Sequence, residues 1–356
     1  MKERRTVNEE AIVTLKAVLC GCGAMAHGWV RALKTTPGLA DAIEIVGLVD
    51  LDARVARQLA ETFGLTEAVI DTDLDRVLRE TRADLLFDVV VPAARRAVVA
   101  SGLEHGCHVL SEKPMAASLD EARELVALAE AAGRIHAVVQ NRRFISGIRR
   151  MRRFVESGVI GDLTGIHCDF FIAPHFGGFR EKMDNVLLLD MAIHTFDAAR
   201  FVSGKRPLSV YCLETNPAGS WYAHGASANA IFRLSDDVAF TYRGSWCAEG
   251  RRTSWESAWR LVGSKGMLTW DGEEAFDAAV AGEEEGLLRG YRPIEVPPAP
   301  REQETHGHAS VIADFLDAIR SGRPPETAGF DNIKSLAMVF GAIESARTGQ
   351  PVAIEA

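Results

Sequence analysis

The amino-acid sequence predicts an α/β protein: a doubly wound parallel sheet comes first, and a second α/β domain with an open, mostly antiparallel or mixed sheet follows it. Two observations predict this order. Up to about residue 141, short apolar runs alternate with helical patterns, as in parallel strands joined by helices. Beyond residue 143, most strand patterns follow one another through short turns, which is typical of antiparallel pairs.

The first strand, turn and helix carry the most specific motif of the chain. An apolar run at 17–20 leads into GCGAMA at 21–26, and a helical pattern follows to Leu33. A glycine turn between a strand and a helix is typical of dinucleotide binding. Gly21 allows the tight turn, and Gly23 lets the backbone approach a pyrophosphate at the helix N-terminus. A packing turn in an unrelated α/β protein is the alternative.

The second predicted strand, at 43–49, ends at Asp50. A carboxylate at this place suits a hydrogen bond to the adenosine ribose. It favours NAD as the cofactor, because it repels the 2′-phosphate of NADP. Arg54, one helical turn further on, leaves NADP as the alternative.

The rest of the first domain continues the alternation. Ser118 followed three residues later by Glu121 forms a capping box, which starts a helix that Gly133 ends. The predicted strands are 84–91, 108–110 and 135–139, and the predicted helices are 52–63, 93–105 and 118–133. We therefore expect a parallel sheet with helices on both faces.

The second half of the chain has a different pattern. Short polar turns such as SDD at 235–237 separate neighbouring strand patterns and predict hairpins, whereas 272–300 is predicted as loops. The predicted strands are 164–172, 209–213, 228–234, 238–245, 258–262 and 267–270, and the predicted helices are 147–157, 306–320 and 331–347.

Three parts follow from these patterns. We expect a flexible N-terminal arm at 1–14, a dinucleotide-binding domain at 15–141, and a substrate-binding and oligomerisation domain at 142–356. The two closing helices are expected to pack back on the first domain.

Composition points to a cytoplasmic protein whose partner is a small molecule. The net charge of −9 and the lack of long basic runs argue against a nucleic-acid partner. No apolar run approaches the roughly 18 residues of a membrane span, so no membrane partner is expected. The six cysteines are scattered and fit buried thiols in a reducing compartment. The densest basic cluster, RRMRR at 149–153, is interpreted as a solvated helix face.

Two further segments carry candidate chemistry. Lys113, in SEKP directly after a short strand, would lie at the carboxyl edge of the first sheet and could steady an alkoxide. Asp190 and His194 are four residues apart and would share a helix face, which suits a general base. A surface turn and a packed histidine are the respective alternatives. A zinc site that adds His167 or His175 lacks a supporting motif, so no metal is predicted.

Taken together, these segments resemble the Gfo/Idh/MocA family of oxidoreductases, which includes glucose–fructose oxidoreductase and inositol dehydrogenase. The resemblance rests on the order and spacing of the glycine turn, EKP at 112–114, the Asp190/His194 segment and the closing stretch 331–349. It covers nearly the whole chain after about Leu15. It implies an N-terminal Rossmann domain, a C-terminal domain with an open sheet, and a nicotinamide cofactor at their junction.

The resemblance also implies roles for individual residues. The family's catalytic lysine falls on Lys113, and its aspartate and histidine fall on Asp190 and His194. His194 would take the hydroxyl proton, oriented by Asp190, and Lys113 would hold the substrate oxygen. We expect the base to titrate between about pH 6 and 8. The expected cofactor contacts are Gly21, Gly23, Ala24, Met25, Asp50, Pro92, Glu112 and Lys113, and the expected substrate contacts are Arg96, Asn141, Arg143, His175 and Arg180.

Two features depart from the family pattern. Many members carry a His four residues after the proline that ends the fourth strand, whereas Pro92 is followed here by Arg95 and Arg96, which could bring an anionic substrate group into reach. The loop 175–182 suits a flexible wall of the substrate pocket or a plain surface loop. The segment QNRRF at 140–144 matches the family's crossover between the domains.

The resemblance therefore implies an NAD(P)-dependent dehydrogenase or reductase acting on CH–OH groups of a sugar, cyclitol or related polyol. We expect a homodimer or homotetramer that associates through the second sheet. Two alternatives remain on the same fold. One is an NAD-dependent glycosidase that uses transient oxidation, and the other is a non-catalytic NAD(P)-binding regulator.

Overall fold

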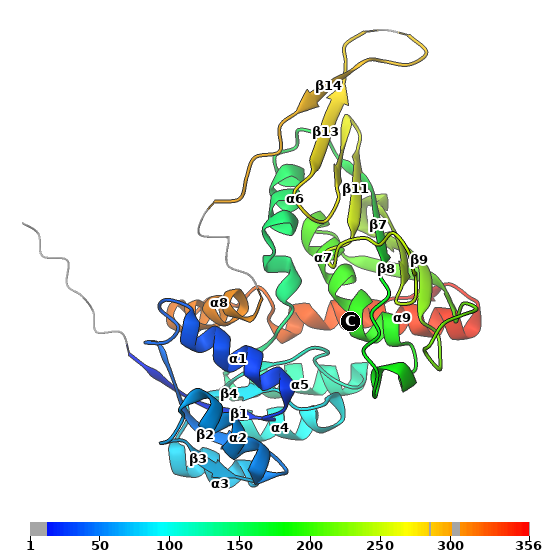
Figure 1. The fold of residues 1–356 in the computed structure, drawn as a ribbon. Helices are drawn as coiled ribbons and strands as arrows, with labels where there is room; N and C mark the ends of the chain where they lie inside the picture. Colours follow the sequence, from blue (N-terminus) through cyan, green and yellow to red (C-terminus); the bar gives the residue numbers. More distant parts are fainter. Residues whose placement is uncertain (1–12, 285, 301–306, 356) are drawn as a thin grey trace, which may run out of the picture.

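The computed structural model describes residues 13–284, 286–300 and 307–355, so the predicted arm at 1–14 lies almost wholly outside the described residues. Two β-sheets form the framework, and the predicted fold class is confirmed. The first sheet lies at one end of the molecule and the second extends away from it (Figure 1). Helices α8 (His308–Ser321) and α9 (Gly329–Thr348) lie across the middle, between the two sheets.

The first sheet has six parallel strands in the order β3-β2-β1-β4-β5-β6. From β1 the chain continues outward through β2 to β3, and from β4 it continues in the opposite direction through β5 to β6. In open sheets of this kind, ligands bind beyond the carboxyl ends of the strands at the point where the order reverses. The strands are β1 Leu15–Cys20, β2 Ile43–Val49, β3 Val69–Asp71, β4 Leu85–Asp88, β5 His108–Ser111 and β6 His136–Val138.

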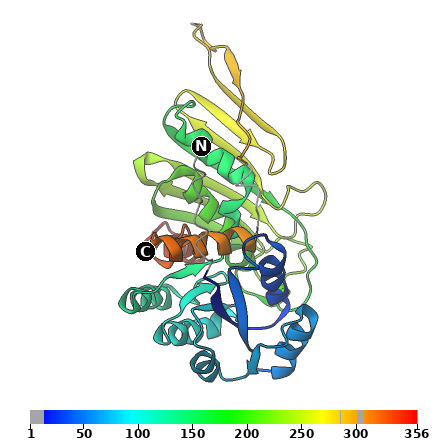
Figure 2. The ribbon, with the colours of Figure 1, turned by 90° about the vertical axis from the view of Figure 1, so that its left-hand side faces the viewer.

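Helices cover both faces of the first sheet (Figure 2). The hydroxyl of Ser118 accepts a hydrogen bond from the N–H of Glu121, and Gly133 ends the helix with a φ of 60°, as the sequence predicts. These helices are α1 Ala24–Thr35, α2 Ala53–Phe63, α3 Leu74–Thr81, α4 Pro92–Glu104 and α5 Leu119–Ala132.

Two elements of the first sheet region, β3 and α3, were not predicted. Strand β3 has only three residues, which is too few to show a periodic pattern. Helix α3 has eight residues, and Asp73 caps it by accepting a hydrogen bond from the N–H of Arg76. Strand β3 pairs with β2 and forms the edge of the sheet, and α3 packs against β2 and β3.

The second sheet has nine strands in the order β14-β13-β12-β11-β7-β10-β9-β8-β15. Strands β7 and β10 pair in parallel, and all the other neighbouring pairs are antiparallel, so the sheet is mixed as predicted. The strands are β7 Leu163–Phe171, β8 Pro207–Thr215, β9 Ser227–Leu234, β10 Ala239–Ser245, β11 Ala258–Gly263, β12 Gly266–Trp270, β13 Phe276–Ala281, β14 Tyr291–Ile294 and β15 Val352–Ala353.

The stretch 272–300, predicted as loops, contains strands β13 and β14, so that prediction was wrong. The two strands form a hairpin that projects from the edge of the second sheet (Figure 1). Strand β13 is rich in alanine, which has a low strand propensity, and β14 contains Pro293. Proline is tolerated in an edge strand, because one side of that strand needs no hydrogen-bonded neighbour.

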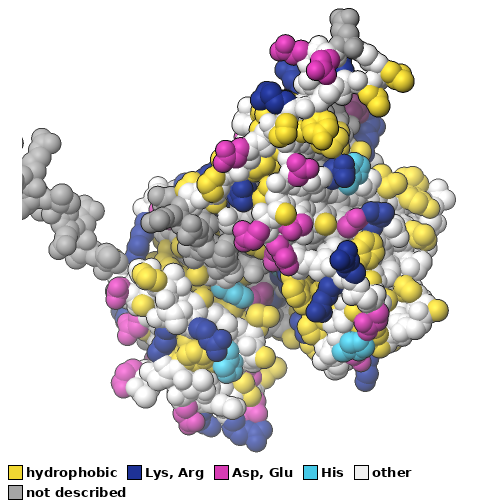
Figure 3. All heavy atoms as spheres, turned by 45° about the horizontal axis from the view of Figure 1, so that its top comes forward, with side chains coloured by type: hydrophobic (Ala, Val, Ile, Leu, Met, Phe, Trp, Pro, Cys, Tyr) yellow, Lys and Arg dark blue, Asp and Glu magenta, His cyan; other side chains and the backbone are white. Residues whose placement is uncertain are grey.

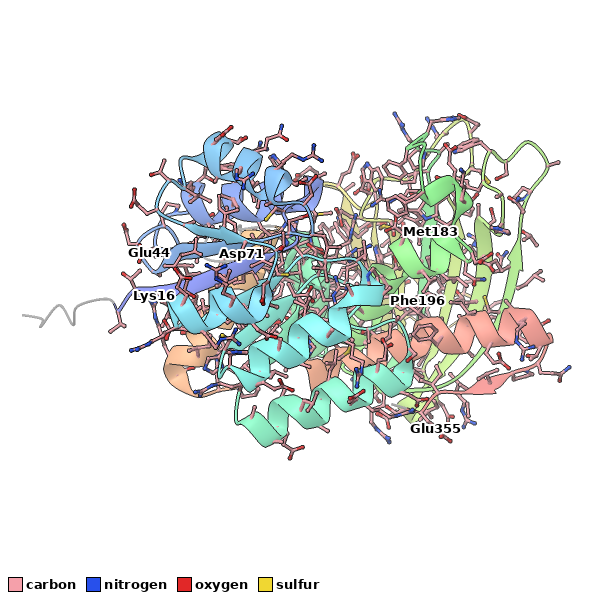
Figure 4. All side chains as sticks on the ribbon, turned by 90° about the horizontal axis from the view of Figure 1, so that it is seen from below. Lys16, Glu44, Asp71, Met183, Phe196 and Glu355 are labelled. Atoms are coloured by element: carbon pink, nitrogen blue, oxygen red, sulfur yellow. The ribbon has the colours of Figure 1, made fainter. Side chains whose placement is uncertain are left out.

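Helix α7 (Ile193–Ser203) is buried along its whole length. Its Phe196 packs against Phe232 and Tyr242 of the second sheet. The residues directly before it, Leu187–Ala192, form a short π-helix, η3, a feature that occurs often at functional sites. Figure 4 shows Phe196 and Met183 in the half of the molecule opposite Lys16, Glu44 and Asp71.

The two C-terminal helices pack against both halves. Phe315 and Leu316 of α8 share a core cluster with Trp29 and Val30 of α1. Helix α9 packs against α5 of the first half and β8 of the second. This shared burial fixes the two sheets relative to each other. In the described residues, no helix is long and apolar enough to cross a membrane.

Candidate functional site

The glycine turn lies at the carboxyl end of β1, next to the point where the strand order reverses. Gly21 has a φ of +93°, and a Cβ at this residue would lie 2.7 Å from the carbonyl carbon of Val89. Only glycine fits there. Gly23 precedes α1, and a Cβ added to it would meet no atom within 4 Å. The fold itself therefore requires Gly21, whereas the space beside Gly23 is left open in front of the helix N-terminus.

Asp50, at the end of β2, holds the glycine turn. Its Oδ2 accepts a hydrogen bond from the N–H of Cys22 at 2.8 Å, and its Oδ1 accepts one from the N–H of Asp52 at 3.0 Å. Arg54 forms an exposed ion pair with Asp52 at 2.7 Å. Two carboxylates therefore stand where an adenosine ribose is expected. Burial, followed by the charge of Asp50, raises the pKa of the Cys22 thiol to about 12.

Exposed apolar side chains surround this turn. Met25 is 44% exposed, Leu51 is 96% exposed and Val91 is 68% exposed. Pro92 follows Val91 as the first residue of α4, so it lies at the same edge of the sheet. Ala26 is fully buried beneath the turn. The edge thus presents a polar turn flanked by apolar surfaces, which suits a ligand that combines phosphates with flat rings.

Lys113 and Asp190 bring the two halves of the chain together. The Lys113 Nζ donates to Asp190 Oδ1 at 2.9 Å and to the backbone oxygen of Asp190 at 2.7 Å. The second carboxylate oxygen of Asp190 accepts from Nε of Arg180 at 2.9 Å. Burial alone would raise the pKa of Asp190, but the charges of Lys113 and Arg180 outweigh it, and the pKa is lowered. Asp190 is therefore a carboxylate that faces two cations.

Glu112, the neighbour of Lys113, is buried and anchors this strand end. Its Oε1 accepts a hydrogen bond from the indole N–H of Trp29 at 2.8 Å and lies 2.8 Å from Nε2 of His308. Burial alone would raise the pKa of Glu112, but the contact with His308 and the N–H of Trp29 lower it overall. Glu112 thus ties β5 to α1 and α8.

His194, in the first turn of α7, is held by a chain of amides. Nδ1 of His194 lies 3.2 Å from Nε2 of Gln140. Nδ2 of Asn332 in turn donates to Oε1 of Gln140 at 3.3 Å. From the sequence, Gln140 was identified only as part of the crossover between the domains, and Asn332 was not singled out. No spacing rule could have found this chain, because its three members come from distant segments.

The prediction that Asp190 orients His194 was wrong. Within the described residues no hydrogen bond joins them, since Asp190 pairs with Lys113 and Arg180 while His194 pairs with Gln140. The four-residue spacing places two side chains on one face only in a regular α-helix. Asp190 lies in the π-helical segment and His194 in α7, which changes the direction of the two side chains.

The electrostatic surroundings of His194 favour its neutral form. Burial, followed by the charges of Lys113 and Arg142, lowers the pKa of His194 well below its ordinary value of 6.5. The expectation of a base that titrates between about pH 6 and 8 was therefore wrong for this group. At neutral pH the imidazole of His194 is therefore uncharged and carries a proton on one of its two ring nitrogens.

Three arginines with expected or suggested substrate contacts are paired with carboxylates of the protein. Arg95 is fully buried, where its Nε donates to Asp88 at 2.7 Å, so it braces the ends of the strands. Arg96 forms an exposed ion pair with Glu124 of α5. Arg143 is buried against Asp197. Arg95 and Arg143 each find a carboxylate inside the fold, so the substrate contact expected of Arg143 was wrong. The carboxylate that holds Arg96 is exposed, and the substrate contact expected of Arg96 stays a prediction.

The remaining expected substrate residues are Arg180, His175 and Asn141. Arg180 reaches Asp190, and its guanidinium stacks over Phe176 with 5.1 Å to the ring centre. His175 stacks on Trp221 at 3.7 Å and lies 3.0 Å from Glu249. Asn141 starts the short helix η1 (Asn141–Phe144) and is half-buried.

An aromatic wall adjoins Arg180, and the sequence did not reveal it. Phe176 packs edge-on against Trp246, and Trp246 packs edge-on against Trp255. Phe176 and Trp255 are each 46% exposed, so the wall faces solvent. The space-filling view shows the surface notched between the two halves of the molecule (Figure 3). A wall of this kind suits the apolar face of a small ligand.

The two histidines considered for zinc lie apart from any ligand set. His167 contacts Thr241 through Nδ1 at 2.6 Å, and His175 lies on Trp221. The residues that the structure describes include no group of three or more metal-binding side chains.

Two family models match the chain. Residues 15–140 match the oxidoreductase family model with an NAD-binding Rossmann fold, and residues 148–269 match the GFO/IDH/MocA C-terminal domain. The chain therefore belongs to the Gfo/Idh/MocA family of oxidoreductases, as its sequence motifs predict.

Characterised relatives and a solved structure align along nearly the whole chain. D-apiose dehydrogenase from Paraburkholderia graminis is 24% identical over 96% of this chain and 90% of its own. A 1,5-anhydro-D-fructose reductase from Ensifer adhaerens is 23% identical over 95% of this chain and 98% of its own. The crystal structure of an oxidoreductase from Agrobacterium radiobacter in complex with NAD+, L-tartaric acid and magnesium has a TM-score of 0.83 at 22% identity, covering 96% and 99% of the two chains. At this identity the structural likeness shows the fold alone.

These matches establish the class of the protein. It is an NAD(P)-dependent oxidoreductase with an NAD-binding Rossmann fold, and this prediction is confirmed. The names of the two relatives, a dehydrogenase and a reductase, favour this class over the glycosidase and the non-catalytic regulator.

Proposed function

We propose that the protein transfers a hydride between NAD and a hydroxyl or carbonyl carbon of a sugar, cyclitol or related polyol. The observation that carries the proposal is the pairing of Lys113, at the edge of the first sheet, with Asp190, from the second half of the chain. His194 follows Asp190 by four residues, and burial, followed by the charge of Lys113, lowers the pKa of His194. A cation, a carboxylate and a neutral imidazole thus meet where the two halves join.

The glycine turn fits a nicotinamide dinucleotide. The open space beside Gly23 and the N-terminus of α1 suit the pyrophosphate, while Leu51 and Val91 suit the faces of the adenine ring. Asp50 and Asp52 support NAD over NADP, because two carboxylates repel a 2′-phosphate, and Arg54 is already paired with Asp52. The bound nicotinamide supplies the hydride chemistry.

Lys113 is proposed to hold the substrate oxygen. Its ammonium group donates hydrogen bonds, so it stabilises the negative charge that develops on an alkoxide. Asp190 positions this ammonium through Oδ1 and positions Arg180 through Oδ2. In this proposal Asp190 orients Lys113 and Arg180, whereas Gln140 orients His194.

His194 is proposed to exchange the proton of the same oxygen, under the control of Gln140. With the amide N–H of Gln140 directed at Nδ1, as in the structure, the neutral ring carries its proton on Nε2 and donates a hydrogen bond. With the amide turned by 180°, its carbonyl oxygen accepts from Nδ1–H, and Nε2 becomes the free base. Asn332 must turn together with this amide, so that its Oδ1, which is buried without a partner among the described residues, accepts from the turned Nε2 of Gln140.

The substrate class rests on the aromatic wall beside Arg180 and on the relatives. The exposed rings of Phe176 and Trp255 suit the apolar face of a sugar or cyclitol, and Arg180 beside them can donate to its hydroxyl groups. The relatives named above act, by their names, on D-apiose and 1,5-anhydro-D-fructose, which are sugars.

Assembly and location belong to the same proposal. Tyr211 and Ile231 face each other across β8 and β9, and with Leu213 they are 44%, 56% and 53% exposed. An exposed apolar patch of this kind marks an interaction surface, so a homodimer or homotetramer through the second sheet is proposed. All six cysteines are free thiols, and five of them are buried, which supports a cytoplasmic location.

The direct test is the reduction of NAD+ across a panel of sugars and cyclitols, followed by absorbance of the reduced nicotinamide. Lys113→Ala and His194→Ala should bind NAD nearly as the wild type does and turn over roughly 10²–10⁴-fold more slowly. Net reduction by the wild type also distinguishes this activity from a glycosidase, which would regenerate its NAD in each cycle. Near-normal turnover by either variant would refute the assigned role of that residue.

A further inference from the structure

We propose that a cavity bordered by α6 (Ser146–Glu156), α7 and α9 binds a small polyanion, a metabolite that carries two or more phosphate or carboxylate groups. The cavity has a volume of about 560 Å³, within the usual range for small-molecule sites. It lies away from the proposed substrate site. Gly204, on its rim, is ten residues beyond His194, which corresponds to roughly 15 Å along a helix.

The charge of the lining favours an anion. Of the thirteen residues that line the cavity, eight are Lys or Arg and three are Glu or Asp. The whole chain carries a net charge of −9, so this concentration of positive charge runs against the average of the protein. Cavity walls with one sign of charge concentrate the field and attract small ions of the opposite sign.

The three carboxylates of the lining are already engaged. Glu326 accepts hydrogen bonds from both terminal nitrogens of Arg149 at 3.0 Å, and Glu156 accepts from Arg152 at 2.7 Å. Asp331 pairs with Arg200 at 2.8 Å, with Arg143 at 3.2 Å, and more distantly with Lys334. Asp197, which is buried beside the lining, also pairs with Arg143 and, at 3.7 Å, with Arg200. These acids position the arginines that they contact, and they do not pair with every cation of the lining.

Two arginines that line the cavity, Arg153 and Arg206, are available to bind a ligand. The guanidinium of Arg153 is exposed and makes no hydrogen bond or ion pair with any residue that the structure describes. Arg206 is also exposed, and its nearby acid, Asp236, is already paired with Lys205 at 2.5 Å. A ligand with two anionic groups could therefore bridge Arg153 and Arg206 without breaking an existing pair.

The ring of Phe201 is part of the cavity lining. The guanidinium groups of Arg152, Arg149 and Arg143 lie over this ring, with 4.6, 5.1 and 5.5 Å to its centre. Stacking holds each guanidinium by its face, while its N–H edge bonds to a carboxylate of the protein, so these three arginines form fixed walls around the unpaired cations. The interpretation of RRMRR at 149–153 as a solvated helix face was therefore wrong: Arg149, Arg152 and Arg153 line this cavity.

Isothermal titration calorimetry on the NAD-saturated protein tests the proposal. Saturation with NAD fills the dinucleotide site, so that a phosphate-bearing probe reports on the second site. Pyrophosphate and citrate are titrated separately, and we expect one site per chain for at least one of them, weakened by added salt. The stronger probe shows whether the natural ligand carries phosphates or carboxylates.

Charge-reversal variants locate the binding. Arg153→Glu combined with Arg206→Glu should weaken the binding of that probe at least tenfold. Arg79, on α3, is another exposed arginine, so Arg79→Glu is the matched control and should leave binding unchanged. If the double variant does not fold, Arg153→Ala alone is tested, and a smaller loss of probe affinity is expected.

Three results would overturn the proposal. They are the absence of binding by both probes at millimolar concentration, binding that the double variant leaves unchanged, and a change in oligomeric state of the double variant without any anion binding. The last result would assign this face to contacts between copies of the chain. None of these measurements depends on catalysis, so the outcome is independent of the proposed function.

Discussion

Replacing Gln140 with glutamate tests the proton route through His194. In the wild type a neutral amide nitrogen lies 3.2 Å from Nδ1 of His194. Gln140→Glu keeps the shape of the side chain but places a carboxylate oxygen against this nitrogen. A carboxylate can only accept, so the neutral ring would carry its proton on Nδ1 and expose Nε2 as the base.

The size of the effect follows from the same distance. Two opposite unit charges 3.2 Å apart attract by about 5 kcal/mol at an effective dielectric constant of about 20. Burying the new carboxylate offsets part of this gain, and a close opposite charge typically shifts a pKa by about 1–3 units. We therefore expect the pKa of His194 to rise by that amount, from a value that burial and the charge of Lys113 hold well below 6.5.

The assay is the pH dependence of kcat/KM in the oxidation direction. A base must be unprotonated to act, so the rate rises with pH through its pKa. For the wild type the acidic limb of the profile should lie below pH 6.5, and in Gln140→Glu it should move upward by about 1–3 pH units. Nitrogen chemical shifts of His194 would report the tautomer directly.

A control and a clear refutation accompany this variant. Gln140→Met has a similar volume and no charge, so it should lower the rate without moving the limb upward. An unmoved limb in a folded Gln140→Glu protein that binds NAD would show that His194 is not the titrating base. The proton would then have to pass through Lys113.

Three further predictions address the cofactor and assembly. Gly23→Val should weaken NAD binding at least tenfold, about 1.4 kcal/mol, measured by calorimetry, because its side chain enters the open space before α1; unchanged affinity would place the pyrophosphate elsewhere. Asp50→Ala should raise the NADP-to-NAD ratio of kcat/KM, and a wild type that already prefers NADP would contradict the role of Asp50. Leu213→Lys with Ile231→Lys should convert an oligomer into a monomer in light scattering, whereas a monomeric wild type would refute the interface.

The sequence by itself determined the features that depend on neighbouring residues. The strand, glycine turn and helix around Gly21, the cap at Ser118 and the hairpins of the second sheet each rest on local backbone preferences. These preferences can be recognised from a few consecutive residues of the sequence. The family, the fold class and the presence of a dinucleotide site followed from them.

Only the tertiary structure decided which side chains act together. Lys113 and Asp190 are 77 residues apart, and Gln140 and His194 are 54 apart, so no local pattern assigns these partners. The π-helical segment before α7 also broke the rule that residues four apart share a face. Partner choice depends on which groups the fold buries side by side, because a buried charge or amide must find its complement wherever the chain brings one.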